Sequence, residues 1–497
     1  MITLSTAALL AFLLSLSLTP IVRSLALRTG VVDAAGFVHR KIHATDVPRL
    51  GGVALVISFC VPITGLLFVD SSVGRLLAEQ REFLICLLGG SLIIALLGLY
   101  DDLRGADAKL KLLVQVATAT AVYLGGFRIE FINFPLLGDS LGVLSFPITL
   151  LWIVGITNAL NLIDGLDGLA AGMAFFGVVP MIILALADSN LLLGLITLTL
   201  VGSLLGFLVY NFHPAKIFMG DTGSMFLGFV LALVTVQTSH KSSVAASLLA
   251  PVLALGVPIL DTSIAVARRA WRGRPLFSAD RNHLHHRLLT AGLGHRNAVL
   301  ALYAVAAGFA TASVAITFHR NVSYALVLVC AAILCGVLMR TVGYLTLTDG
   351  VGGTLRVGAE RRRQNRQLSL AVDDAITALD QITQVQELAN LTGQLLLNEG
   401  FSYGCLALSG ASTGSLSYVW GDGGSASKRR FVFELRGQDL ERKGELVVAS
   451  TDESEWADDA VNILQAYVTA MVTWLAQHSV EVGSMTDESV LLGNTSK

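Results

Sequence analysis

Long apolar stretches constrain the fold of this chain more than any other feature of its sequence. We count about eleven of them, and each is long enough to cross the roughly 30 Å hydrocarbon core of a bilayer as a helix. The predicted spans are residues 4–22, 51–70, 83–100, 111–126, 146–163, 169–187, 191–210, 223–239, 244–267, 298–318 and 322–341. Only 14% of the residues are charged and the mean hydropathy is +0.69, which excludes a water-soluble fold. We predict an all-α polytopic membrane protein over residues 1–345.

Basic residues are distributed unevenly over the connections between these spans. Lys and Arg number sixteen in one set of alternate connections and five in the other. Basic residues favour the cytoplasmic side, so we expect the N-terminus outside and the C-terminus inside the cell. The net charge of −2 gives no argument for a nucleic-acid partner.

The composition changes at about residue 346, where charged residues become frequent and membrane-length apolar runs end. Apolar residues from Ile376 to Leu388 recur every three or four positions, which predicts an amphipathic helix. β-rich runs follow near 403–408, 416–420, 430–436 and 445–449, and a helical stretch near 456–477 comes last. We predict a C-terminal soluble α+β domain over residues 346–497, of unknown role, which loosely resembles a GAF-type sensory domain in element order.

Acidic residues gather at the predicted cytoplasmic ends of the spans. They are Asp101, Asp102, Asp164, Asp167 and Asp221. A carboxylate within hydrocarbon is costly, so such groups are usually functional or paired. The adjacent pair Asp101 and Asp102 has two interpretations. In the first, one acid holds a metal ion while the other transfers a proton. In the second, both lie at a solvated helix end where Lys109 and Lys111 balance their charge.

The second cluster repeats polar side chains at a spacing of three. Asn158, Asn161, Asp164 and Asp167 would stack on one face of a helix. We interpret this polar face as part of a functional site, and the alternative is that it serves polar packing between membrane helices.

The third cluster, residues 211–224, reads Asn-Phe-His-Pro-Ala-Lys-Ile-Phe-Met-Gly-Asp-Thr-Gly-Ser and runs into a predicted helix. Asp221 offers Mg²⁺ a hard oxygen ligand, and the free N–H groups of residues 222–224 would attract an anion. Phe218 either stacks on a flat base or anchors the membrane interface. The cluster has the parts of a nucleotide diphosphate site.

The fourth cluster is Arg281-Asn-His-Leu-His-His-Arg, in the most basic connection. Arg281, His283, His285 and His286 suit contacts with phosphate and sugar hydroxyls. Zinc binding is the alternative, although no cysteine is near and flanking arginines repel a cation.

Two smaller features accompany these clusters. Pro48-Arg49-Leu50-Gly51-Gly52 opens the second span with a basic turn whose backbone is accessible. Asp261 lies inside the span predicted at 244–267, and it faces either the site or a neighbouring polar group.

The motifs at 98–111, 158–170, 211–224 and 280–288 resemble those of the polyprenyl-phosphate N-acetylhexosamine-1-phosphate transferases, glycosyltransferase family 4. The histidine motif is similar to that of the branch acting with N-acetylglucosamine and undecaprenyl phosphate. The resemblance covers residues 1–345. It implies transfer of N-acetylglucosamine 1-phosphate from a UDP-N-acetylhexosamine to undecaprenyl phosphate, with UMP released, as the first membrane step of cell-envelope glycopolymer synthesis.

The resemblance also implies a bacterial inner-membrane location, a cytoplasmic active site, and Mg²⁺ as cofactor with Mn²⁺ as an alternative. The implied metal ligands are Asp221 and Asp164. The implied catalytic acids are Asp101, the base for the lipid phosphate, together with Asp102, Asp164 and Asp167. The implied substrate-binding residues are Asn158, Asn161, Asn211, Phe218, Arg281, His283, His285 and His286.

Two other functions compete with this one. A transporter would place its polar site near the bilayer midplane, and a membrane-anchored sensor would leave the four clusters unexplained. The sequence leaves open which UDP-sugar is used, which glycopolymer is served, whether a covalent intermediate forms, and the oligomeric state, a homodimer being one alternative.

Overall fold

The computed structural model describes the following parts of the chain: residues 2–33, 47–130, 141–239, 249–272, 283–290, 292–318, 336, 351–399, 401, 403–409, 415–421, 429–436, 442–450 and 456–477. The chain divides into two compact units. The first comprises Met1–Ala267 and Phe277–Leu347, and the second comprises Arg268–Leu276 and Thr348–Lys497.

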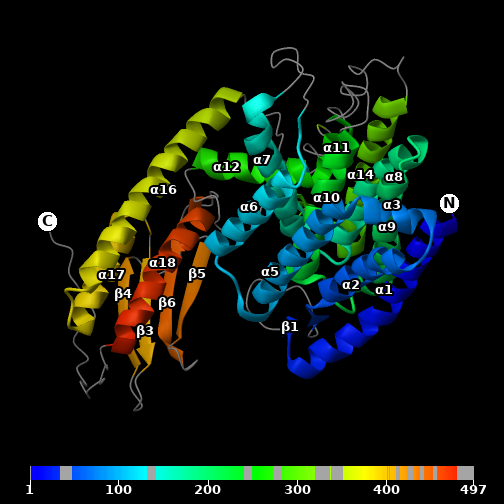
Figure 1. Ribbon diagram of the computed structural model, residues 1–497. Coiled ribbons are helices and arrows are strands. Elements are labelled where there is room, and N and C mark those ends of the chain that lie inside the picture. Colours follow the sequence, from blue (N-terminus) through cyan, green and yellow to red (C-terminus); the bar gives the residue numbers. More distant parts are fainter. Residues whose placement is uncertain are drawn as a thin grey trace. The chain divides into compact units, whose positions relative to one another are not determined.

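The regular secondary structure among the described residues of the first unit is helical, apart from one short strand pair (Figure 1). Its longer helices are α1 Ile2–Thr29, α2 Gly51–Gly65, α5 Gly90–Arg104, α6 Ala108–Leu124, α7 Ser145–Ile163, α8 Leu169–Ala187, α9 Leu191–Asn211, α10 Gly220–Ser239, α14 His295–Phe318 and the part of α12 Gly256–Arg272 up to Ala267. Shorter elements are η1 Leu66–Phe68, α3 Ser72–Glu79, α4 Arg81–Leu84, the π-helical η2 Ile85–Gly89, η3 Gly142–Leu144, α11 Leu249–Ala254 and α13 Leu284–Thr290. The strands β1 Val32–Asp33 and β2 Val47–Pro48 pair antiparallel.

Eight helical segments among the described residues are long and apolar enough to cross a membrane. They are Ile2–Thr29, Gly51–Phe68, Arg81–Arg104, Gly142–Ile163, Leu169–Ala187, Leu191–Asn211, Gly220–Gln237 and His295–Ile316. Each corresponds to a predicted span. The span predicted at 111–126 is the 17-residue helix α6, and the one predicted at 244–267 is divided between α11 and α12. The span predicted at 322–341 lies outside the described residues, apart from residue 336.

Helix α10 is the most deeply buried span of this unit, with 83% of its apolar window inside the protein. It packs against α2, α5, α7 and α8. Small residues allow these close approaches, because a Cβ on Gly52 would collide with the backbone of Gly223, and one on Gly98 would collide with the backbone of Asp221 and Thr222. The packing fixes the first turn of α10 against α2 and α5.

The second unit combines three helices with a four-stranded sheet. The helices are α16 Val351–Leu379, α17 Val385–Asn398 and α18 Trp456–Gln477, and the strands are β3 Tyr403–Ser409, β4 Ser415–Gly421, β5 Arg429–Arg436 and β6 Arg442–Ser450. All pairings are antiparallel, in the order β4-β3-β6-β5.

Alternation along the strands gives this sheet one core face. Phe433 and Leu435 of β5 are buried with Leu406 and Leu408 of β3, whereas Val432, the residue before Phe433, is exposed. The bounds of β3, β4, β5, β6 and α18 agree with the predicted runs, so the four predicted strands and the last helix are confirmed.

The prediction of one continuous amphipathic helix from Ile376 to Leu388 is wrong. Helix α16 ends at Leu379, and α17 begins at Val385 behind a capping box formed by Gln384 and Glu387. The apolar period continues across this turn, so the pattern alone did not reveal the break.

Candidate active site

Four of the five predicted acids lie at the ends of α5, α7 and α10. Asp101 and Asp102 belong to the last turn of α5, Asp164 follows the last residue of α7, and Asp221 lies in the first turn of α10. Side chains more than 100 residues apart in sequence thus meet at one end of the bundle.

A lysine joins two of these acids. Lys111 Nζ lies 2.7 Å from Asp101 Oδ2 and 2.6 Å from Asp221 Oδ2. Asp101 Oδ1 also accepts a hydrogen bond from the backbone N–H of Ala106 at 2.6 Å. All three charged side chains are between 17% and 23% exposed, so water screens them only partly. The ammonium group marks a position between two carboxylates where positive charge is stabilised.

Asp102 has a different environment from its neighbour Asp101. Its carboxylate accepts hydrogen bonds from the backbone N–H groups of Asp221, at 2.9 Å, and Thr222, at 3.0 Å, and from the hydroxyl of Thr222, at 2.7 Å. The prediction that the start of α10 offers free N–H groups to a substrate anion is therefore wrong for Thr222. The anion at this helix N-terminus is the protein's own carboxylate.

Asp164 experiences the excess negative charge of the cluster. Burial raises its pKa to about 8, and the charges of Asp221 and Asp102 act in the same direction, while the guanidinium of Arg49 opposes them. Grouped carboxylate oxygens with uncompensated charge are the donor set that Mg²⁺ prefers. The residues present therefore fit a divalent cation.

The second cluster does not lie on one helical face, which corrects that prediction. Helix α7 ends at Ile163, so Asn158 and Asn161 are helical and Asp167 lies in the turn before α8. Asn158 Nδ2 donates to Gln115 Oε1 at 2.7 Å, and Asn161 Nδ2 donates to Ser224 Oγ at 3.0 Å. These two amides join α7 to α6 and α10.

Asp167 is buried and contacts the loop after α9. Its Oδ2 atom lies 2.8 Å from Nδ1 of His213 and accepts a hydrogen bond from the backbone N–H of Ala215 at 3.0 Å. Asp167 thus fixes the loop that leads to Asp221.

Asn211 and Phe218 lie at the two ends of that loop. Asn211 is buried, and its Nδ2 donates to the backbone carbonyl of Ile217 at 2.9 Å. The backbone of Phe218 donates to the carbonyl of Pro48 at 2.7 Å and accepts from Gly51 N–H at 2.9 Å. The basic turn at 48–52 is therefore joined to the segment that carries Asp221.

The histidine motif contacts the loop between α7 and α8. His283 Nδ1 lies 3.0 Å from Asp261 Oδ2, and Asp261 Oδ1 accepts from the backbone N–H of Leu284 at 2.9 Å. His285 is buried against Gly165, where a Cβ would collide with its ring. Burial lowers the pKa of His285 to about 3, so it is neutral at physiological pH.

The remaining members of this motif are only partly described. The ring of His286 lies 4.3 Å from that of His285, centroid to centroid. Arg281 lies outside the described residues. Of the two alternatives left open for Asp261, the structure shows contact with a polar group, His283.

The structure adds two residues to the candidate site. Lys111, which the sequence presents as a counter-charge to Asp101 and Asp102, lies between Asp101 and Asp221. His213, for which the sequence predicts no role, contacts Asp167. The signal for both in the sequence is their position inside the motifs at 98–111 and 211–224.

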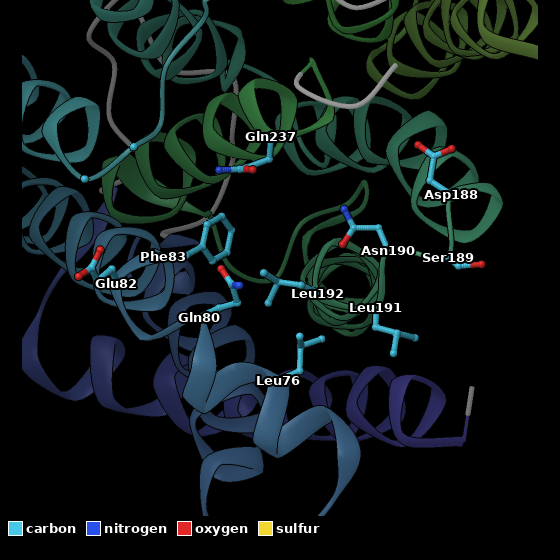
Figure 2. A pocket seen from close by; sticks show the side chains of 12 residues that line it. Leu76, Gln80, Glu82, Phe83, Asp188, Ser189, Asn190, Leu191, Leu192 and Gln237 are labelled. Carbon is cyan, nitrogen blue, oxygen red and sulfur yellow. The ribbon is translucent and has the colours of Figure 1, made fainter. Parts of the chain in front are cut away.

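A separate cavity of about 640 Å³ lies away from the acids (Figure 2). Figure 2 shows around it the side chains of Gln80, which follows α3, Asn190, which precedes α9, and Gln237 of α10. Gln237 lies 16 residues after Asp221 in α10, which corresponds to about 24 Å along a helix. This cavity is therefore at the opposite end of the bundle from the carboxylates.

Comparisons with known proteins agree with this arrangement. A sequence profile of glycosyl transferase family 4 matches residues 84–239, which contain all five acids. The chain is 41% identical over 307 residues to a probable undecaprenyl-phosphate N-acetylglucosaminyl 1-phosphate transferase of Bacillus subtilis, covering 61% of this chain and 82% of that relative. It is 36% identical over 314 residues to a decaprenyl-phosphate N-acetylglucosaminephosphotransferase of Mycobacterium tuberculosis, covering 57% and 74%. A phospho-N-acetylmuramoyl-pentapeptide-transferase of Staphylococcus saprophyticus is 30% identical over 303 residues, covering 57% and 89%.

Proposed function

Since the chain belongs to glycosyl transferase family 4, we propose that it transfers N-acetylglucosamine 1-phosphate from UDP-N-acetylglucosamine to a polyprenyl phosphate, with release of UMP. The observation that carries the proposal is the convergence of three acids: Asp101 and Asp221 both contact Lys111, and Asp164 interacts electrostatically with Asp221 and Arg49. The names of the two N-acetylglucosamine relatives support the transferred group and the lipid acceptor.

Charge repulsion is the main obstacle to this reaction, because both reactants are phosphorylated anions. Asp221 and Asp164 would hold Mg²⁺, or Mn²⁺ in its place. When bound, the metal ion would supply positive charge to the diphosphate. Lys111 and Arg49 contribute further positive charge beside it. Asp221 and Asp164, through the ion that they would hold, and Lys111 and Arg49, through their own charge, would bring together two anions that otherwise repel each other.

Asp101 is the proposed base. Its carboxylate would take the proton from a phosphate hydroxyl of the lipid, and the freed oxygen would form a bond to the β-phosphorus of the donor. The bond from the β-phosphorus to the UMP oxygen breaks, and UMP leaves with that electron pair. In the structure Lys111 Nζ donates a hydrogen bond to Asp101 Oδ2. The ammonium group must therefore move toward a phosphate before this oxygen accepts the proton.

Asp102 is a positioning residue in this scheme. All three of its hydrogen bonds go to the first turn of α10, which places Asp221. His285 is neutral and would contact the sugar phosphate as a hydrogen-bond donor, without adding charge. Asp261 orients His283 in the same motif.

A location in the bacterial plasma membrane is part of the proposal. The set of alternate connections that includes those beside Asp101, Asp164 and Asp221 holds sixteen of the Lys and Arg residues, against five in the other set, which supports a cytoplasmic active site, an external N-terminus and a cytoplasmic C-terminal unit. The acids lie at helix ends, which argues against a transporter with its site at the midplane.

Purified protein in detergent tests the proposal directly. With Mg²⁺, undecaprenyl phosphate and UDP-N-acetylglucosamine, we expect stoichiometric release of UMP and lipid-linked N-acetylglucosamine. Asp221→Asn should abolish the release, whereas Asp107→Asn is the matched control because Asp107 is exposed and makes no capping hydrogen bond. Full turnover by Asp221→Asn would falsify the metal assignment, and no product from any UDP-N-acetylhexosamine would reject the function.

A further inference from the structure

A second group of ligand-type side chains lies beside the carboxylates around Lys111. It consists of Asp167, His213 and His295, and one ligand atom from each lies within 4.8 Å of the other two. The residues come from the turn before α8, the loop after α9 and the first position of α14. His213 and His295 have ring centroids 5.4 Å apart. Three separate segments thus converge on one point.

The chemistry of this group differs from that of the proposed magnesium site. Two imidazoles and one carboxylate form the ligand set that binds zinc, whereas Mg²⁺ prefers oxygen ligands and water. Zinc bonds of about 2.0–2.1 Å place tetrahedral ligand atoms about 3.3 Å apart. Starting from separations of up to 4.8 Å, small side-chain rotations bring the three atoms to that spacing.

The surroundings are already fixed for such a site. The hydroxyl of Tyr303, two turns along α14 from His295, donates to the backbone carbonyl of Gly168 at 2.6 Å. Asp167 is held by the backbone N–H of Ala215. The Asp167 carboxylate and both ring nitrogens of His295 are buried, while the His213 side chain is 34% exposed, so the group meets solvent on the side of His213. Little chain movement is needed to complete the coordination.

We propose that Asp167, His213 and His295 form a zinc site that links the first turn of α14 to the loops before α8 and after α9. Zinc would be bound by three protein ligands and a water molecule. Because Asp167 lies three residues from Asp164, the ion would stabilise the chain segment that carries part of the active site. The proposal does not depend on the transferase activity.

Zinc binding by the intact protein is the primary measurement. The full chain should be purified with a tag that contains no histidine, stripped with a chelator, and dialysed against buffered zinc with millimolar Mg²⁺ present. We expect one zinc per chain by elemental analysis, a higher unfolding temperature, and the visible absorption of four-coordinate Co²⁺ when Co²⁺ replaces zinc. Absence of bound zinc from the wild-type protein would overturn the proposal, as would displacement by Mg²⁺, which would place the ion among the carboxylates.

Single substitutions locate the site. His213→Ala and His295→Ala should each weaken zinc binding by more than about 100-fold. Mutation of a residue that only hydrogen-bonds to a metal ligand already costs about 10–100-fold in affinity, and removal of a ligand itself should cost more. His286→Ala is the matched control, since it removes a partly exposed histidine outside the group and should keep one zinc. Retention of zinc by both His213→Ala and His295→Ala would refute the assignment. The wild-type measurements decide the question if either variant fails to fold.

Discussion

The carboxylate of Asp102 accepts hydrogen bonds from both the backbone N–H and the hydroxyl of Thr222, 120 residues later in the chain. The end of α5 therefore caps the start of α10. A negative charge is favourable at a helix N-terminus, where N–H groups lack intrahelical partners. The adjacent Asp101 contacts Lys111 instead, so the two neighbouring acids have different partners, which is consistent with the proposed roles of Asp102 in positioning and of Asp101 as the base.

Removing the Asp102 carboxylate should destabilise the start of α10. We expect Asp102→Ala to lower the free energy of unfolding by about 0.5–2 kcal/mol, the usual cost of losing a helix cap. Asp102→Asn keeps one oxygen acceptor and should lose less. Thermal unfolding in detergent measures both, and Asp107→Ala is the control because Asp107 precedes α6 without a capping bond. A variant lacking Asp102 that is as stable as the wild type would contradict the capping role.

Lys111 should be required for turnover. Hydrogen bonds to charged groups contribute about 1.5–3 kcal/mol, so Lys111→Met should reduce UMP release by roughly 10–100-fold. The exposed Lys109 provides the comparison, and Lys109→Met should stay near the wild-type rate. Equal rates for the two variants would show that Lys111 is only a surface counter-charge.

Much of the membrane unit could be predicted from sequence because bilayer thickness fixes the length of a crossing helix. Pro258 in the apolar run 244–267 indicates a kinked helix, and the break between α11 and α12 lies at Leu255, three residues before it. The turn between α16 and α17 could not be predicted, because its residues keep the helical period.

The site was predictable to the level of residue type. Carboxylates beside apolar spans indicated Asp101, Asp164 and Asp221 without any structure. The partner of Asp102 was not predictable, because local rules see the start of α10 with open N–H groups but not an acid 119 residues earlier. The contact between Asp167 and His213 also depends on tertiary folding alone.

Gly98 should be essential for packing α5 against α10. A Cβ at Gly98 would overlap the backbone of Asp221 and Thr222, which cannot move without displacing the site. Gly98→Ala should therefore lower the unfolding temperature and the yield of folded protein, an overpacking cost of about 1–3 kcal/mol. Gly155→Ala is the matched control, since Gly155 is also helical but has open space at its Cβ position. If both variants behave alike, the close approach of α5 and α10 is not required.

Proton competition at Asp164 should make Mg²⁺ binding dependent on pH. With a pKa of about 8 in the metal-free protein, this carboxyl is protonated at lower pH, whereas a metal ligand must be deprotonated. The apparent Mg²⁺ affinity should therefore fall as pH falls, by up to about tenfold per unit between about pH 8 and pH 6, and level off above pH 8. Titration of the unfolding temperature with Mg²⁺ at each pH measures the affinity. Asp164→Asn should bind Mg²⁺ more weakly and lose this slope, because its amide does not titrate. An equally steep slope in Asp164→Asn would assign the competing proton to another carboxylate and remove Asp164 from the metal site.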